Sequence, residues 1–301
     1  WQITINLQPG DYTYKFRNGY YDYWDSPGWE SDNSLIDGGC AHGTYFDRLV
    51  SVQNNDLVEG PFCFGNCDEI CFDETSIEYE LVWSDEFDGN GAIDTLKWHH
   101  QTQLPNGNSW YNGEIQHYTD REQNSYVSDG TMKIVALRET YTDQGHTKDF
   151  TSARLNSKFA FTNGKVEVRA RLPEGVGTWP AIWMLGQNIS EPGAYWETQG
   201  YGTTGWPFCG EIDIMEHWGG NQSYIQSAIH TPSSYGGTIN HGGQYVANST
   251  NDFNIYTLEW TEEKMVFSVN DNPHYTYNPA IKNSDTWPFE DPQYLILNIA
   301  I

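Results

Sequence analysis

The sequence predicts an all-β protein built from β-sandwich domains. Its 301 residues include 29 Gly, 13 Trp and 20 Tyr, a composition rich in turn formers and in aromatic residues that favour strands. Short strand-like segments follow one another with Gly, Asn and Asp between them, and no segment has the periodicity of a convincing amphipathic helix. The chain is long enough for two domains, and a core of that size does not need disulfides throughout.

The first domain, residues 1–62, is predicted to be a small β-sandwich module. Trp1–Leu7 and Asp11–Phe16 alternate in character around the turn sequence of residues 8–10, which predicts a hairpin. A further alternating segment, Phe46–Val52, predicts another strand. A group of aromatic residues between these segments suits either a core or an exposed platform for sugar rings: Tyr20, Tyr21, Tyr23, Trp24 and Trp29.

Four of the five cysteines lie in or near a linker, residues 63–78. We expect Cys40 to pair with Cys63 and Cys67 with Cys71, although four cysteines allow three pairings. A metal site is the alternative, but the spacing is irregular and no pair of His lies nearby. Disulfides would place the protein in an oxidising compartment outside the cytosol. Cys209 stands apart and is expected to be a buried free thiol.

Residues 79–301 are predicted to form one large antiparallel β-sandwich. The segment contains no internal repeat and no low-complexity tract. Its expected strands are separated by turn residues: Tyr79–Trp83, Thr131–Arg138, Ala153–Phe159, Gly164–Leu172, Ala181–Leu185, Ile212–Glu216, Ser223–His230, Asn254–Thr261, Lys264–Val269 and Tyr294–Ile301.

The charge of the chain limits its partners. Asp and Glu number 41 against 15 Lys and Arg, a formal net charge of −26, which would repel nucleic acid, anionic membranes and sulfated polymers. The sequence contains no run of about eighteen apolar residues that could span a membrane, and its first residues do not resemble a signal peptide. We therefore expect a monomer that binds a neutral partner.

Three carboxylates in six residues mark the segment that most resembles a catalytic site. Alternate residues of a strand share a face, so Glu211 and Asp213 point the same way and strict alternation would send Glu216 to the other face. A β-bulge near Met215 would return Glu216 to their face. Crowded carboxylates have separated pKa values, so one can stay protonated near neutral pH.

This pattern suits the hydrolysis of a glycosidic bond. One carboxyl protonates the leaving oxygen while a second attacks the anomeric carbon, and a separation of about 5–5.5 Å indicates the retaining mechanism. A solvated acidic strand face is the first alternative, but Trp206 and Trp218 are poor neighbours for solvated carboxylates. A calcium site is the second, but calcium prefers flexible loops with additional backbone oxygens.

The carboxylate segment and several others resemble glycoside hydrolase family sixteen, in its laminarinase-like branch, which carries the extra residue before the last Glu. The resemblance covers about residues 79–301. It implies a concanavalin-like jelly roll whose concave face binds an extended β-glucan, with Glu211 as nucleophile, Asp213 as electrostatic helper and Glu216 as general acid/base. The supporting segments follow in the family's order: Leu81–Gly89, Trp110–Tyr118, Thr151–Arg154, Gly164–Arg169, Thr178–Met184 and Tyr294–Ala300.

The resemblance also suggests substrate-binding residues. By position they are Trp110, Asn112 and Glu114 on the glycone side, Trp179 and Trp206 near the reacting sugar, and His230 beside the carboxylates. Tryptophan can stack on the apolar face of a pyranose, although core packing is the alternative for each one. We assign Trp83, Trp183 and Trp260 to the core.

Both ends of the sequence depart from the family pattern. Family chains normally continue past Ile301 into a last strand with an Asp that often binds a structural calcium. The N-terminal module resembles the second half of a domain often appended to bacterial polysaccharide hydrolases. We therefore expect a fragment of a longer secreted enzyme that requires no cofactor, with a structural calcium in the full-length protein and its usual C-terminal ligand absent here.

The predicted function is retaining endo-hydrolysis of a β-1,3-glucan such as laminarin. The alternatives are hydrolysis of mixed-linkage β-glucan or of an agar-type galactan, and binding of β-glucan without catalysis. The three intact carboxylates argue against the last of these.

Overall fold

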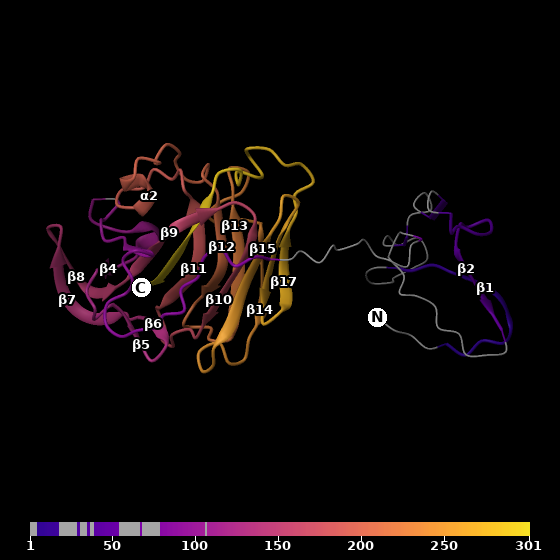
Figure 1. Ribbon diagram of the computed structural model, residues 1–301, viewed down its shortest axis with the longest axis horizontal. Coiled ribbons are helices and arrows are strands. Elements are labelled where there is room, and N and C mark those ends of the chain that lie inside the picture. The colour runs from indigo at the N-terminus through magenta and orange to yellow at the C-terminus, as the bar shows by residue number, and fades with distance from the viewer. Residues whose placement is uncertain are drawn as a thin grey trace. The chain divides into compact units, whose positions relative to one another are not determined.

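The computed structural model of the chain describes residues 5–17, 29–30, 35–36, 39–53, 67, 79–105 and 107–301. It divides into two compact units, Trp1–Glu78 and Tyr79–Ile301, each of which is considered by itself (Figure 1).

The first unit contains one described pair of strands. Strand β1 (Gly10–Tyr14) pairs antiparallel with β2 (Arg48–Val52), so that Tyr12 lies opposite Val50. The predicted hairpin is therefore wrong in its partner, because β1 pairs with a segment far along the chain and residues 5–9 form no strand. Of the aromatic group between the predicted strands, Trp29 is described and the other members lie outside the described residues.

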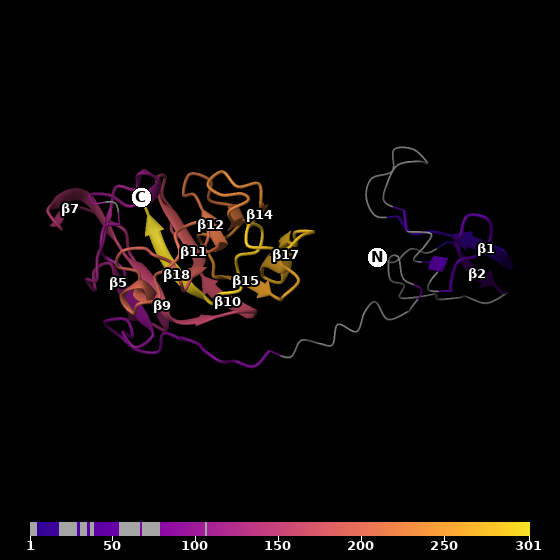
Figure 2. The same cartoon turned by 90° about the horizontal axis from the view of Figure 1, so that it is seen from above.

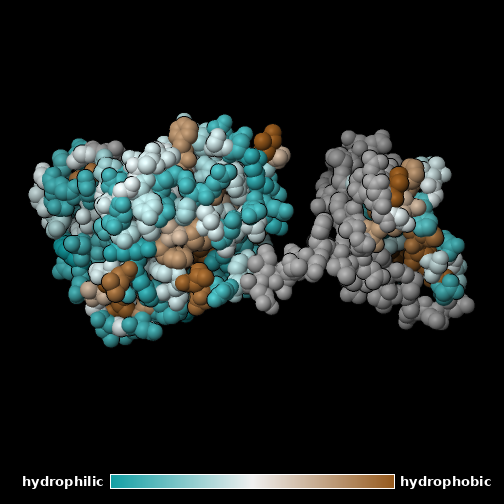
Figure 3. Space-filling model, turned by 45° about the horizontal axis from the view of Figure 1, so that its top comes forward, coloured by the Kyte–Doolittle hydropathy of each residue, from teal (hydrophilic) through white to brown (hydrophobic). Residues whose placement is uncertain are grey.

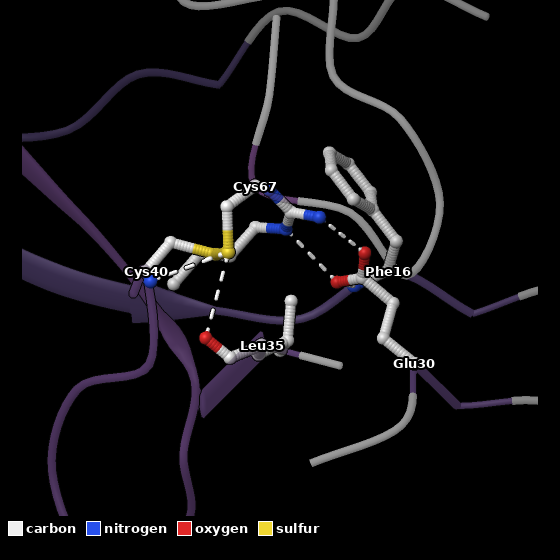
Figure 4. The surroundings of a disulfide bond; sticks show 6 residues. Phe16, Glu30, Leu35, Cys40 and Cys67 are labelled. Atoms are coloured by element: carbon white, nitrogen blue, oxygen red, sulfur yellow. Dashed lines mark hydrogen bonds and ion pairs between the residues drawn. A yellow bond between two sulfur atoms is a disulfide. The ribbon is translucent and has the colours of Figure 1, made fainter. Parts of the chain in front are cut away.

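A disulfide in this unit joins Cys40 to Cys67, whose Cα atoms lie 5.5 Å apart (Figure 4). The predicted pairings of both residues are therefore wrong, and Cys63 and Cys71 lie outside the described residues. Spacing along a chain does not decide which cysteines meet in space. A buried ion pair lies beside the disulfide, where Arg48 Nε donates to Glu30 Oε2 over 3.0 Å.

The second unit is a sandwich of two antiparallel sheets (Figure 1, Figure 2). The larger sheet has seven strands in the order β14 (His241–Tyr245), β13 (Tyr224–His230), β12 (Glu211–His217), β11 (Trp179–Gly186), β18 (Gln293–Ala300), β9 (Arg154–Phe161) and β3 (Trp98–His100). The smaller sheet has four, in the order β10 (Gly164–Ala170), β15 (Asn254–Trp260), β16 (Met265–Val269) and β17 (Asn272–Tyr277).

Shorter elements complete the second unit. Strand β8 (His146–Ser152) lies between β4 (His117–Tyr118) and β7 (Leu137–Asp143), and β5 (Ser125–Ser128) pairs with β6 (Thr131–Ile134). The helical pieces are a 3-10 turn, η1 (Tyr111–Gly113), and a single turn, α2 (Tyr195–Thr198). The predicted all-β jelly-roll sandwich is confirmed.

The main core lies between the two sheets. Inward-facing residues of β12, Ile212 and Ile214, are at most 1% exposed and belong to one cluster with Leu258 and Phe267 of the opposite sheet. Because alternate residues of a half-buried strand face opposite sides, this core fixes which side chains of β12 point away from it.

Most predicted strands are present within a residue or two, but two predictions fail. Tyr79–Trp83 is not a strand, and Leu81 and Val82 are 78% and 73% exposed there. An alternating segment becomes a strand only where a neighbouring strand supplies hydrogen bonds. Thr131–Arg138 is split between β6 and β7.

The face of the second unit seen in Figure 3 is predominantly hydrophilic, with a few small hydrophobic groups among polar side chains. Within the described ranges, no helix has the length and apolar character needed to cross a membrane.

Candidate active site

Strand β12 carries the three predicted carboxylates near the middle of the larger sheet. Its register with β11 shows how they are arranged, since Glu211, Asp213 and Glu216 lie opposite Leu185, Trp183 and Ala181. Those partners are alternate residues of a regular strand and share one face. The three carboxylates therefore share that face too.

The extra residue is taken up by a bulge. Met215 lies opposite Ile182, whereas Ile214 has no register partner on β11. On β13 the register likewise shifts between Asp213 and Glu216. Ile214 and Met215 are both 1% exposed, so two consecutive side chains point into the core. The predicted bulge is confirmed.

A glycine fixes the entry to this strand. Gly210 has φ +73°, and a Cβ at this position would lie 2.6 Å from the ring of Phe289. Glycine alone combines this backbone conformation with such a close approach. The chain therefore turns tightly into Glu211 against the core.

Indole and imidazole groups surround the carboxylates. Trp206 Nε1 donates to Glu211 Oε2 over 2.9 Å, and Trp179 Nε1 donates to Glu216 Oε1 over 3.1 Å. His230, the register partner of Glu211 on β13, places Nε2 at 3.1 Å from Asp213 Oδ2 and 3.5 Å from Glu211 Oε1. Three of the predicted binding residues thus contact the carboxylates directly.

The carboxyl groups lie where ionisation is unfavourable. Burial, followed by repulsion from Asp213, raises the pKa of Glu211 to about 8, and the same causes in the same order raise the pKa of Glu216 to about 8. Burial raises the pKa of Asp213 to about 8. The cluster therefore holds protons at neutral pH, so a carboxylic acid and a carboxylate can coexist in it.

A cavity of about 260 Å³ opens beside Trp179. The rings of Trp179 and Trp218 stack with their centroids 6.1 Å apart. Asn112, which is exposed and has φ 56°, and Glu114 also line this cavity. The structure thus brings two predicted glycone-side residues to the cavity lined by Trp179, whose indole N–H donates to Glu216. Trp218 was not among the predicted binding residues, although its position two residues after Glu216 could have pointed to it.

Trp110 does not present a ring to this cavity. It is 2% exposed, packs edge-on against Tyr118, and lies under the Arg154 guanidinium at 5.1 Å. The prediction that it stacks on a sugar is therefore corrected to a core position, because a buried ring has no free face.

Glu114 belongs to a buried polar network behind the cavity. It accepts hydrogen bonds at Oε2 from Gln116 Nε2 at 2.7 Å and from the Tyr118 hydroxyl at 3.0 Å. Burial raises the pKa of Glu114, and the nearby Arg154 opposes that rise. Arg154 itself pairs with Glu191 at 2.9 Å, which compensates its buried charge.

The three tryptophans assigned to the core all lie in or against hydrophobic clusters. Trp260 is 1% exposed, and Trp83 packs against the main core. Trp183 is different, because it lies opposite Asp213 on the face of the carboxylates and donates from Nε1 to Asn298 Oδ1 over 2.7 Å. It also packs against a second, smaller hydrophobic cluster that includes Leu185 and Tyr294, so its assignment to the core is confirmed, and the register of β11 decides which face of the sheet it packs on.

Cys209 is fully buried and is the one unpaired cysteine among those described. Burial raises the pKa of its thiol to about 12, so it would not act as a nucleophile at neutral pH. The prediction of a buried free thiol is confirmed.

One group of possible metal ligands is found in the described part of the chain. Donor atoms of Glu211, Asp213 and His230 lie within 4.8 Å of one another. Two carboxylates and one imidazole fit calcium poorly, because that ion takes six to eight oxygen ligands. The same three side chains instead belong to the carboxylate site described above.

Comparison with known proteins gives consistent results. The family described as glycosyl hydrolases family 16 matches residues 112–300. A beta-glucanase of Rhodothermus marinus is 40% identical over 234 residues, which are 74% of this chain and 76% of that protein.

Solved structures resemble the chain as well. A LamA variant from Zobellia galactanivorans, solved in complex with laminaritriose and laminaritetraose, is 48% identical, with a TM-score of 0.67 over 73% of this chain and 88% of the other. The laminarinase from Rhodothermus marinus is 40% identical, with a TM-score of 0.65 over 74% of this chain and 86% of the other.

Proposed function

This chain belongs to the family 16 glycosyl hydrolases, and on that basis we propose that it is a retaining endo-hydrolase of β-1,3-glucan of the laminarin type. The observation that carries the proposal is the placement of three carboxylates on one face of a bulged strand, each with an indole or imidazole nitrogen within 3.1 Å of a carboxylate oxygen. Glycosidic hydrolysis needs one carboxyl as acid and one as nucleophile.

We assign the nucleophile to Glu211. The Trp206 N–H and the neighbouring His230 both favour its ionised form and so oppose the rise in its pKa. Attack by this carboxylate on the anomeric carbon forms a covalent glycosyl-enzyme, which water then hydrolyses with retention of configuration.

Glu216 is the general acid and base. A raised pKa lets it hold a proton at neutral pH for the leaving oxygen, and the charge of Asp213 contributes to that rise. After the first step the ionised Glu216 can take a proton from the incoming water. Asp213 tunes both neighbours electrostatically.

The surroundings of the carboxylates suit a neutral sugar chain. Trp206 is 42% exposed beside Glu211, and Trp218 lines a cavity together with Trp179, the partner of Glu216. Aromatic faces bind the apolar faces of pyranose rings. The charge of −26 makes a sulfated polymer a poor partner.

The roles are tested with Glu211→Gln, which keeps the size of the side chain and removes its nucleophilic oxygen. We expect reducing-sugar release from laminarin to fall by at least about a thousandfold. Glu262→Gln, at an exposed turn, is the matched control and should keep full activity. Activity retained in Glu211→Gln would refute the assignment. NMR detection of the first-formed anomer tests retention.

Other substrates are tested by product analysis. Faster cleavage of mixed-linkage β-glucan or agarose than of laminarin would change the substrate that we assign to the protein. Laminarin binding without turnover would favour a recognition protein. We also propose that the protein is secreted, which agrees with the disulfide between Cys40 and Cys67. We propose that it acts as a monomer.

A further inference from the structure

The bulge that returns Glu216 to the face of Glu211 leaves one residue of β12 out of register with both neighbouring strands. Ile214 has no register partner on β11 or on β13. Its carbonyl oxygen accepts a hydrogen bond from the Ser227 hydroxyl over 2.7 Å. Ser227 is fully buried and sits between Gln226 and Ala228, the partners of Glu216 and Asp213.

The Ser227 hydroxyl is held in turn from the opposite sheet. Its oxygen lies 2.8 Å from His274 Nε2, and His274 Nδ1 lies 3.2 Å from Gln244 Nε2. His274 is on β17 and Gln244 is on β14, where the two sheets approach each other (Figure 1).

The hydrogen bonds that run from Gln244 through His274 and Ser227 to the Ile214 carbonyl allow one consistent assignment of donors and acceptors. Ser227 has a single hydroxyl hydrogen, which goes to the Ile214 carbonyl, so its oxygen must accept from His274. His274 therefore carries its hydrogen on Nε2 and presents a bare Nδ1, which accepts from the Gln244 amide. Burial lowers the pKa of His274 to about 4, so the ring is neutral as this order requires.

We propose that Ser227 and His274 are positioning residues for the acid/base Glu216, acting through the Ile214 carbonyl at the bulge. This inference rests on the proposed function of Glu216. Loss of the Ser227 hydroxyl would remove a buried hydrogen bond that ties the bulge to β13, so the bulge would shift or rearrange. Glu216 follows two residues later, and a displacement of about 1 Å at a reacting group can cost about a hundredfold in rate.

The test uses the leaving group of the substrate. A sugar leaving group needs protonation by the acid, whereas a dinitrophenolate leaves without it. For Ser227→Ala we expect kcat/KM to fall about tenfold on a laminari-oligosaccharide and less than about twofold on a 2,4-dinitrophenyl β-laminaribioside. KM for the oligosaccharide should stay within about twofold, because the cavity beside Trp179 is untouched.

A second pair of variants keeps the inference testable if Ser227→Ala is poorly folded. His274→Gln retains an N–H donor near the position of Nε2, and His274→Leu does not. We expect His274→Gln to keep at least half of the activity on the oligosaccharide and His274→Leu to match Ser227→Ala.

The matched control is Ser157→Ala. Ser157 is also buried, donates to the Phe159 carbonyl over 2.7 Å and accepts from the Leu295 N–H, but it lies on β9, away from β12. Its variant should lower the thermal midpoint about as much as Ser227→Ala and leave both kcat/KM values unchanged.

Three results would overturn the inference. These are an equal loss of kcat/KM on both substrates for Ser227→Ala, no loss on either, or identical behaviour of His274→Gln and His274→Leu. If the wild-type protein cleaves no β-glucan at all, the proposed function fails and the inference fails with it. If the wild type is active and Glu216→Gln loses activity only on the oligosaccharide, failure of the Ser227 test concerns the positioning role alone.

Discussion

The three carboxyl groups of β12 combine high charge density with an apolar setting. Asp213 is 4% exposed, and its neighbours along the strand, Ile212 and Ile214, lie in the core. Placing ionised carboxylates there costs free energy, which the groups avoid by keeping protons. The buried carboxyl groups thus reduce the stability of the fold, and they provide acid and base groups that act near neutral pH.

The first prediction concerns the stability of the fold against pH. The folded-state pKa of Asp213 lies above its usual 3.8, at about 8. Its contribution to the free energy of unfolding is therefore fully present below about pH 4 and is lost as pH rises through about 8. We expect the wild-type thermal midpoint to fall over this window, and Asp213→Asn to reduce the fall by several degrees.

The measurement is a series of thermal unfolding curves between about pH 4.5 and 9. About 1 kcal/mol corresponds to roughly 2–4 °C for a unit of this size, so the difference should be resolved. The thermal midpoint of Glu262→Gln should change with pH by as much as that of the wild type. If the thermal midpoint of Asp213→Asn also changes with pH by as much as that of the wild type, Asp213 is not the source of the pH dependence.

The bulge of β12 decides which side chains the strand offers to the cleft. Two consecutive core residues, Ile214 and Met215, replace one step of the alternation, so that Glu216 returns to the face of Glu211. A regular strand with one residue fewer would give the same faces, whereas a strand that keeps the bulge and gains one residue after it would turn Glu216 to the core.

The second prediction follows from this geometry. Deletion of Met215 should leave all three carboxylates on one face, with activity reduced by less than about a hundredfold. Insertion of one Ala between Met215 and Glu216 should turn Glu216 into the core if the bulge persists, or move it one residue further from Glu211 if the strand becomes regular. In both cases laminarin hydrolysis should fall by more than about a thousandfold. Activity assays on folded protein check this, and equal activity of the two variants would contradict it.

The chain as a whole consists of two units with different means of stabilisation. The second unit has a large core between two sheets, whereas the described part of the first unit has one strand pair, a buried ion pair and the disulfide. The two bonded cysteines are 27 residues apart, and closing such a loop stabilises by about 3.5 kcal/mol.

The third prediction separates the two units. Replacing both Cys40 and Cys67 by Ser should lower the unfolding temperature of the first unit, because its unfolded chain is no longer constrained. It should leave kcat/KM on soluble laminarin within about twofold of wild type. Calorimetry and activity assays on the full chain check both statements. A large loss of activity would show that the first unit contributes to catalysis.

Much of this could be predicted from the sequence because it depends on local periodicity. The composition indicated an all-β chain, and the spacing of Glu211, Asp213 and Glu216 required a bulge if all three act together. Strands such as β8, β14 and β17 were missed because they are polar or glycine-rich and owe their structure to a neighbouring strand.

The sequence by itself determined the class of fold, the chemistry of the carboxylate strand and the need for its bulge, since side-chain type and a period of two are properties of a single segment. Tertiary structure alone decided the pairing of Cys40 with Cys67, the burial of Trp110, the place of Trp183 opposite Asp213 and the contact of His274 with Ser227. Each of these joins segments distant in the chain, and which segments meet is fixed by how the strands pair and how the sheets pack.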